Sequence, residues 1–301
     1  IMSSDNLPKI TEVVKRQLDK HSRLNLRKIR KLSDKQKEPL IRITVSNQKI
    51  SIVKFGVVKK NRINALMLLI KETVKKYPQI NTTFYININD WSPKDLQDLP
   101  IFVMSARNGT KNFVIPDYLF CQDYSKRSGR NNDQIPHDQI VINHRRKIPF
   151  EEKKNKCFFR AGTSKNKRII DLFKDSDNVD AQWSRDNFMS YSDMFTHKYV
   201  ITHYMKWDSV YFFLKSDILT FMYTGFQTYL WYDLFLEEDT HYLTFKTIDE
   251  FKEKYQKMEN NPEKAKRIIK KSSRVCDQYF NITTAIDYLG ILLLEYQKKN
   301  T

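Results

Sequence analysis

The chain has 301 residues, a hydrophobic share of 40% and a formal net charge of +18. Its length allows two domains with sizeable cores, whereas three scattered cysteines without CxxC spacing argue against a disulfide framework or a structural zinc site. No apolar run approaches the ~20 residues that span a bilayer, and the charged residues 1–25 lack the apolar core of a secretory signal.

The first part of the chain combines a charged start with alternating strands and helices. Residues 1–40 are densely charged and contain one helical stretch, so they are interpreted as a basic N-terminal arm. Apolar and polar residues then alternate at the spacing of two paired strands. The elements predicted here are a helix at 10–19, strands at 41–45 and 50–53, a helix at 63–77, and strands at 84–89 and 101–104.

The second part of the chain repeats this alternation. Residues 123–144 are polar and predict a long loop, which places a domain boundary near residue 150. The last three predicted helices have apolar residues at a spacing of three to four. The elements predicted here are strands at 157–160, 179–183 (a strand or a turn), 199–203 and 218–222, and helices at 167–174, 210–214, 228–236, 248–259, 262–277 and 283–298.

The alternation of strands and helices predicts an α/β fold with mainly parallel sheets. Such sheets bind ligands beyond the carboxyl ends of their strands. Asp90 follows the predicted strand 84–89, where a carboxylate can face such a ligand. The alternative is a structural role, in which Asp90 forms an Asx turn before Pro93.

The segment 156–168 contains an apolar strand, a glycine, two arginines and the start of a helix. Free N–H groups at a helix start bind phosphate, and Arg160 and Arg168 can add charge-assisted hydrogen bonds that lysine supplies less rigidly. The segment therefore predicts a site for a negatively charged ligand. Arginines near a helix start are also common as solvated surface charges, and the segment alone does not separate the two roles.

Several short motifs follow one another in the order and spacing of a known enzyme family. They read INDW at 88–91, IFVMS at 101–105, PDYLF at 116–120, FRAGTS at 159–164 with Arg168, VDA at 179–181, HKY at 197–199, YLWY at 229–232 and THYL at 240–243. Together they resemble the protein O-glucosyltransferases and capsule-associated glycosyltransferases of family 90. The resemblance runs from about residue 80 to the C-terminus.

The resemblance implies a GT-B-type fold, in which two Rossmann-like α/β domains face a cleft and helices follow at the C-terminal end. On this basis, residues 41–150 are expected to form the acceptor domain, and residues 151–280 are expected to bind the nucleotide sugar. Residues 281–301 are expected to form a helix that packs back across the domains.

The chemistry that the resemblance implies inverts the anomeric centre without a metal ion or a resident cofactor. Asp90 is the expected general base, which deprotonates the acceptor hydroxyl. The residues expected to bind the donor diphosphate are Arg160, Gly162, Thr163, Ser164, Arg168 and Lys206. Of these, Arg160 has an alternative role, which is to pair or pack beneath the loop. The expected donor is a UDP-sugar, UDP-glucose or UDP-xylose, and the expected acceptor is a hydroxyl group on a protein or glycan.

One feature of the family is missing from this chain. After the position of Tyr199 the family has a Ser-x-Arg pair whose arginine contacts the diphosphate, but residues 201–217 contain no arginine. Lys206 is the expected substitute, although a lysine lacks the bidentate fork of arginine. Either the donor is atypical or the enzyme is impaired. The proline of the family's His-Tyr motif is also missing after Leu243.

Other enzymatic and inactive alternatives remain open. A metal-dependent transferase would need a carboxylate pair such as Asp175 and Asp177, although this polar turn is also typical of a solvated loop. His197 and His241 can serve catalysis, but lone histidines beside tyrosine are more often hydrogen-bonded structural residues. A further alternative is a catalytically impaired relative that binds a partner. In such a protein, no substitution could lower turnover, because there is none.

A basic nucleic-acid-binding protein is the main non-enzymatic alternative, because aromatic residues are interleaved with lysine. The lysines are scattered through all regions and the aromatic run 211–213 has core spacing, so nucleic acid is not the expected partner. The net charge also suits anionic membrane surfaces and phosphorylated small molecules. The sequence as given predicts a cytoplasmic protein, and the secretory pathway stays open if the chain is a fragment.

Overall fold

The computed structural model describes residues 6–19, 29, 39–56, 60–89, 94–116, 137–162, 166–203, 207–224 and 228–300. The chain divides into two compact units. Unit 1 comprises residues 1–134, 228–235 and 279–301, and unit 2 comprises residues 135–227 and 236–278. The chain therefore passes between the two units more than once.

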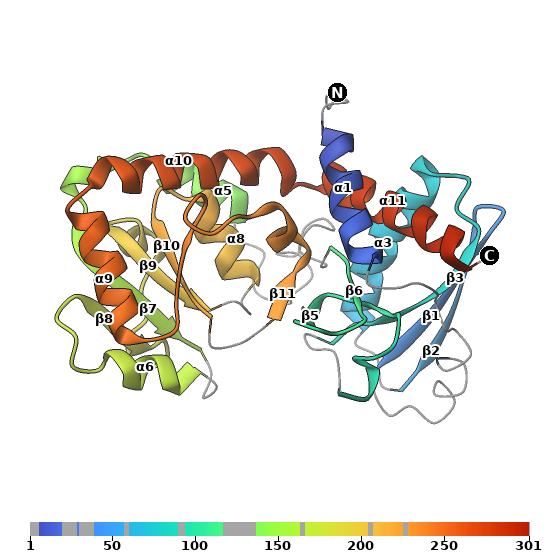
Figure 1. Cartoon of the computed structure of the whole chain (residues 1–301), viewed down its shortest axis with the longest axis horizontal. Helices are drawn as coiled ribbons and strands as arrows, with labels where there is room; N and C mark the ends of the chain where they lie inside the picture. Colours follow the sequence, from blue (N-terminus) through green and yellow to red (C-terminus); the bar gives the residue numbers. More distant parts are fainter. Residues whose placement is uncertain are drawn as a thin grey trace. The chain divides into compact units, whose positions relative to one another are not determined.

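Among its described residues, unit 1 contains a mixed sheet and helices that pack with it (Figure 1). Its strands are β1 (Leu40–Ser46), β2 (Lys49–Phe55), β3 (Thr82–Asn87), β4 (Phe102–Val103) and β6 (Phe113–Val114), and its helices are α1 (Leu7–Leu18), α3 (Lys60–Lys76) and α11 (Ile282–Asn300). The sheet order is β2-β1-β3-β4-β6. Strands β3, β4 and β6 are parallel, while β1 is antiparallel to β2 and β3.

The hairpin of β1 and β2 matches the one predicted from alternating residues. Asn47 and Gln48 connect the strands with φ angles of 49° and 62°. Two consecutive positive φ angles are typical of a type I′ turn, whose twist suits paired strands. On β1, the side chains of Ile41, Ile43 and Val45 are buried and alternate with more exposed ones, so one face of the strand enters the core.

Helix α1 belongs to the core of unit 1, although its residues were interpreted as part of a basic arm. It contacts α11 and buries residues at helical spacing, namely Ile10, Val13, Val14, Gln17 and Leu18. The side-chain Nε2 of Gln17 donates to the carbonyl of Val114 at 3.3 Å, and its Oε1 accepts from the N–H of Val114 at 2.8 Å. These two bonds anchor α1 to the end of β6.

Helix α11 contacts both α1 and α3 within unit 1. Gly290 allows a close approach, because a Cβ at this position would lie 2.3 Å from Cδ2 of Tyr77. The hydroxyl of Tyr77 donates to Oδ1 of Asp287 at 2.6 Å, and Lys76 forms a salt bridge with the same carboxylate. The last helix of the chain is therefore fixed to the end of α3.

Unit 2 contains the second sheet, with helices on both of its faces. Its strands are β7 (Lys154–Ala161), β8 (Val179–Trp183), β9 (His197–His203), β10 (Leu219–Tyr223) and β12 (Leu243–Phe245), and its helices are α5 (His137–His144), α6 (Lys167–Phe173), α7 (Tyr191–Met194), α8 (Trp207–Lys215), α9 (Ile248–Glu259) and α10 (Pro262–Tyr279). The order is β12-β10-β9-β7-β8, and every neighbouring pair is parallel. Numbered along the chain, this is the doubly wound order 2-1-3-4-5.

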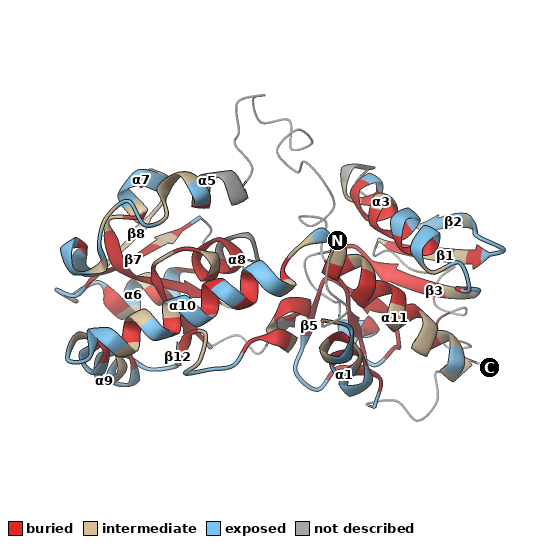
Figure 2. Cartoon of the chain, turned by 90° about the horizontal axis from the view of Figure 1, so that it is seen from above, coloured by how far each residue is buried: buried red, intermediate tan, exposed pale blue. Residues whose placement is uncertain are grey.

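The sheet of unit 2 separates two apolar layers. On one face, Phe159 of β7 packs with Phe173 of α6 and Phe251 of α9. On the other face, Phe158 packs with Phe212 of α8. Adjacent residues of β7 thus enter opposite layers, as the alternation along a strand requires, and Figure 2 shows buried strands between helices whose outer sides are exposed. The predicted α/β class with a parallel sheet is confirmed.

Two predicted elements differ from the structure. Residues 137–144 form α5 where a loop was expected, and this polar helix is held by contacts with α8. Residues 228–236 were expected to be helical but form β11 (Thr228–Leu230) and the 3-10 helix η6 (Trp231–Phe235). Strand β11 pairs antiparallel with β5 (Ser105–Arg107), which is distant in sequence, and local periodicity does not reveal such pairing.

Candidate active site

The strand order of unit 2 reverses at β7, because β8 lies on one side of it and β9, β10 and β12 lie on the other. In doubly wound sheets, ligands bind outside the carboxyl ends of the strands at such a switch point. In this sheet the last strand residues are Ala161, Trp183, His203, Tyr223 and Phe245. We call this row of strand ends the carboxyl edge of unit 2.

The loop after β7 begins at the switch point. Gly162 is exposed and follows the strand directly. The backbone N–H and the hydroxyl of Ser184 both donate to the carbonyl of Ala161, at 2.9 and 3.0 Å, so the chain after β8 fixes the end of β7. Thr163 and Ser164, which were predicted to bind the diphosphate, lie outside the described residues.

Asn166 stands where this loop meets α6. Its side chain is buried, and the amide nitrogen Nδ2 has no hydrogen-bond partner within the described parts of the chain. A buried N–H group without a partner costs about 1–3 kcal/mol. Asn166 is therefore an available donor next to the loop.

Arg168 lies in the first turn of α6, and its side chain is exposed. Its guanidinium carbon lies 6.0 Å from the ring centre of Tyr223, the last residue of β10. This cation–π contact holds the head of Arg168 at the carboxyl edge. Among the residues that the structure describes, Arg168 forms no salt bridge. Its charge is thus not neutralised by a described carboxylate.

Arg160 has a different environment, although it belongs to the same sequence segment. Its side chain is 8% exposed, and its NH2 group donates to Oδ2 of Asp180 at 2.6 Å. Its NH1 group donates to the carbonyls of Phe159 at 3.0 Å and Asp180 at 2.8 Å. Arg160 therefore joins β7 to β8, which matches the pairing role that was left open for it.

The segment before Asp90 is described, whereas Asp90 itself and Lys206 are not. Strand β3 is parallel to β4, so the residues after Asn87 follow a carboxyl end. The side-chain Oδ1 of Asn87 accepts from the N–H of Asn89 at 3.0 Å, and Arg62 donates to the carbonyl of Ile88 at 3.0 Å. These bonds fix the chain up to the residue that precedes Asp90.

A comparison with known families agrees with this geometry. The model for glycosyl transferase family 90 matches residues 3–301. The chain belongs to glycosyl transferase family 90. The match extends beyond the part of the sequence that carried the resemblance and confirms it, and membership supports glycosyl transfer as the activity. No curated protein matches the chain.

The carboxylate pair of the metal-dependent alternative lies elsewhere in this family 90 protein. Asp175 and Asp177 are exposed and follow α6, at the end where the chain enters β8. That end is opposite to the carboxyl edge. Within the described residues, no group of three or more His, Cys, Asp or Glu side chains is placed to hold a metal ion.

Both histidines singled out in the sequence take part in local hydrogen bonds. Nδ1 of His197 lies 3.0 Å from the carbonyl of Asp193, and Nδ1 of His241 accepts from the N–H of Glu237 at 2.9 Å. Burial lowers the pKa of both histidines. His197 begins β9, so it stands at the opposite end of the strand from the carboxyl edge.

Some contacts of the site could not be found from local sequence in this family 90 protein. Tyr223 supports Arg168, Asp180 neutralises Arg160, and Ser184 fixes the end of β7. Each partner comes from another strand or the chain after it, so no spacing rule within 156–168 indicates it. No described helix of the protein is long and apolar enough to cross a membrane.

Proposed function

We propose that this family 90 protein transfers a sugar from a nucleotide-diphosphate donor to a hydroxyl group of a glycan or protein, with inversion and without a metal ion. The donor is a UDP-sugar, UDP-glucose or UDP-xylose. In this proposal unit 2 binds the donor, unit 1 binds the acceptor, and the two α/β units form a GT-B-type enzyme.

The observation that carries the proposal is an exposed cation at the carboxyl edge of unit 2. Arg168 is exposed at the carboxyl edge, has no described salt-bridge partner and stacks on Tyr223. A guanidinium group suits a diphosphate because it offers paired N–H donors in a planar fork. Gly162, which directly follows β7, lets the backbone approach the ligand closely. The buried Nδ2 of Asn166 is a further donor, for which the described residues offer no acceptor.

The proposed reaction is a single displacement at C1 of the sugar. Asp90 accepts the proton of the acceptor hydroxyl while the hydroxyl oxygen forms a bond to C1. The bond between C1 and the diphosphate oxygen breaks, and the electron pair leaves with the diphosphate. Arg168 stabilises the charge that develops on this leaving group.

The role of Arg168 is tested by nucleotide binding. UDP, GDP and ADP are titrated by calorimetry in the presence of EDTA, and one of them, expected to be UDP, should bind. Arg168→Ala should weaken its binding about 10–100-fold, which is the effect of losing a charge-assisted hydrogen bond or pair, and Arg168→Lys should fall between. Arg107→Ala is the control, because Arg107 is an exposed arginine in β5 of unit 1, away from the carboxyl edge of unit 2 in sequence and fold unit.

Two outcomes would contradict the proposed site. Equal affinities of Arg168→Ala and the unaltered protein would remove Arg168 from the donor site. Loss of binding on addition of EDTA would replace the metal-free mechanism with a metal-dependent one.

An impaired relative is the second candidate, because residues 201–217 lack the arginine expected from the family resemblance. Turnover separates the two candidates. Release of UDP from UDP-glucose or UDP-xylose with a hydroxyl acceptor should be measurable and should fall at least about 10²-fold in Asp90→Asn, the scale of lost general-base catalysis. Asp95→Asn, an exposed aspartate nearby in sequence, should keep full activity. UDP binding without any turnover would favour the impaired relative.

A further inference from the structure

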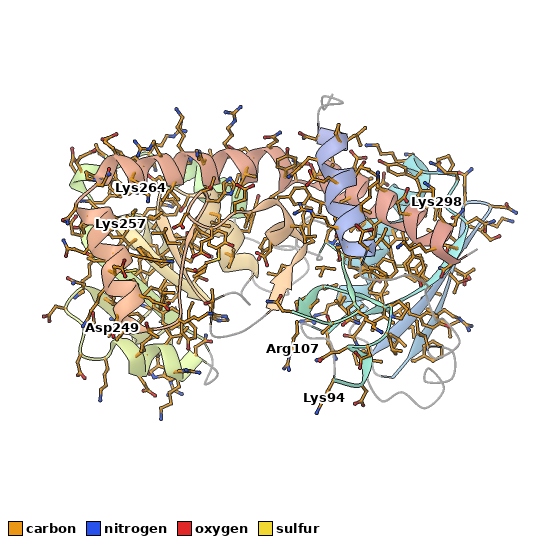
Figure 3. The ribbon with its side chains drawn as sticks, viewed as in Figure 1. Lys94, Arg107, Asp249, Lys257, Lys264 and Lys298 are labelled. Carbon is orange, nitrogen blue, oxygen red and sulfur yellow. The ribbon has the colours of Figure 1, made fainter. Side chains whose placement is uncertain are left out.

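Helix α10 carries a row of four cations on its outer side. Arg267, Lys270, Lys271 and Arg274 are exposed, and their spacing of three, four and seven residues places them on one face of the helix. The opposite face is buried in unit 2 through Ala265, Ile268, Ser272, Ser273, Val275 and Cys276. Figure 3 labels Lys264 on this helix and shows long side chains standing away from its outer side.

No described acidic side chain neutralises this row. None of the four cations forms a salt bridge with a residue that the structure describes. Both acidic residues of the helix have other partners, since Glu263 pairs with Lys266 and Asp277 pairs with Arg145 and Lys215. We call the four residues the α10 cation row; it spans about 10 Å along the helix axis.

Two further cations follow a segment that is fastened to the same helix. Arg145 forms a salt bridge with Asp277 at 3.6 Å and a hydrogen bond with Ser273. Arg146 and Lys147, the next residues, are both exposed. The basic character of this part of unit 2 is therefore not confined to one helix.

The α10 cation row lies away from the candidate active site. The hydroxyl of Ser272 donates to the carbonyl of Leu214, which precedes the start of β10, and Lys266 pairs with Glu151, which precedes the start of β7. Helix α10 thus lies at the amino ends of the strands, whereas Arg168 lies at the carboxyl edge. A surface that contacts α10 leaves the carboxyl edge of unit 2 accessible.

We propose that the α10 cation row is a docking surface for an anionic lipid bilayer. The row stands on a convex helix, and a convex row of cations can reach the headgroups of a flat surface together. Its apolar residues are buried in unit 2, so the contact is electrostatic and involves no insertion of the helix. Each lysine or arginine near an anionic bilayer strengthens binding about fivefold.

Nucleic acid fits the same row less well. Proteins that bind single strands combine a positively charged groove with aromatic side chains on which the bases stack. The exposed positions of α10 carry no aromatic residue. The phosphates of a strand could still contact the row, so an oligonucleotide is included in the test.

The test measures sedimentation of the full chain with vesicles of phosphatidylcholine alone or mixed with phosphatidylserine, and its binding to a single-stranded oligonucleotide, at low and at physiological salt. The variant Arg267→Gln/Lys270→Gln/Lys271→Gln/Arg274→Gln removes the row. The control Lys49→Gln/Lys54→Gln/Lys71→Gln/Lys75→Gln removes the same number of charges from exposed positions of β2 and α3. Unfolding midpoints of both variants and their affinity for UDP verify that the fold and the donor site are unchanged.

The unaltered protein should bind the mixed vesicles and not phosphatidylcholine alone, more weakly at higher salt. The α10 variant should lose on the order of 10²-fold or more in affinity, while the control should change by less than about fivefold. Equal losses in both variants would show a bulk charge effect and overturn the proposal, as would failure of the unaltered protein to bind. Loss of oligonucleotide binding with vesicle binding kept would assign the row to nucleic acid. Each outcome can be read whether or not the protein has transferase activity.

Discussion

The ion pair between Arg160 and Asp180 gives the sharpest test of how the two arginines of segment 156–168 differ. Arg160→Met removes three donated hydrogen bonds, at 2.6, 2.8 and 3.0 Å. Among the described side chains, Gln182 then remains as a donor to the carboxylate of Asp180, at 2.7 Å. The variant should therefore lose stability rather than donor affinity.

The magnitude follows from burial. Breaking a buried ion pair by removing one partner costs about 3–5 kcal/mol. The side chain of Asp180 is 21% exposed, against 8% for Arg160, so water recovers part of the solvation of the carboxylate. We expect Arg160→Met to lower the free energy of unfolding by about 2–3 kcal/mol. The double variant Arg160→Met/Asp180→Asn leaves no unpaired charge, and we expect it to recover at least about 1 kcal/mol of that loss.

Urea unfolding of the two single variants and the double variant measures this coupling, and calorimetry with UDP measures donor affinity in the same proteins. The affinity of folded Arg160→Met for UDP should stay within about threefold of that of the unaltered protein. This change is smaller than the one expected from losing a hydrogen bond to a charged group. A variant that keeps its stability but loses UDP binding would refute the reasoning. In that case Arg160 contacts the donor.

Two other predictions concern unit 1. Gly290→Ala should destabilise the protein by about 1–3 kcal/mol despite the better helix propensity of alanine, because its Cβ would lie 2.3 Å from the Tyr77 ring. Urea unfolding measures this loss, and the same substitution should cause no such loss in a Tyr77→Ala background. A loss of stability in that background would point to another cause. Asp233 is partly exposed, but its carboxyl group is buried, and the resulting desolvation raises the pKa of this group to about 8. The folded state then keeps a proton that the unfolded chain releases near pH 4, so the free energy of unfolding should fall as the pH rises from about 4 to 8. Asp233→Asn can still accept from the N–H of Leu230, and it should reduce the decrease in stability with pH. Thermal unfolding at pH 5 and pH 8 measures this decrease. An equal decrease in the variant and the unaltered protein would argue against a protonated Asp233.

The predictions from sequence succeeded where the signal is local. The alternation in residues 41–45 and 50–53 predicted the hairpin; in β1 it reflects one buried face, whereas β2 pairs with β1 although its side chains are mostly exposed. The last three helices were recovered nearly residue by residue, because their apolar positions repeat at the period of the helix. The ordered motifs between about residue 80 and the C-terminus were enough to identify family 90.

Local sequence was misleading where a distant segment determines the structure. Residues 228–230 join a strand because β5 offers backbone partners, and residues 7–18 enter the core because α11 and Val114 receive them. A helix was predicted within segment 1–40, but the charge of the segment hid that one face of this helix is buried. Neither partner can be inferred from the residues that surround these segments.

The sequence by itself determined the parallel α/β character of unit 2 and located a basic, glycine-containing segment after one of its strands. It left a pairing role open for Arg160 but could not establish it, because Arg160 and Arg168 have the same chemistry and lie eight positions apart. Tertiary structure decided between them, because strand pairing places Asp180 beside Arg160, while α6 and β10 place Arg168 on the ring of Tyr223 without a described counter-ion. The charge state of a site depends on which side chains the fold brings within a few ångströms, and that proximity is set by sheet order and not by distance along the chain.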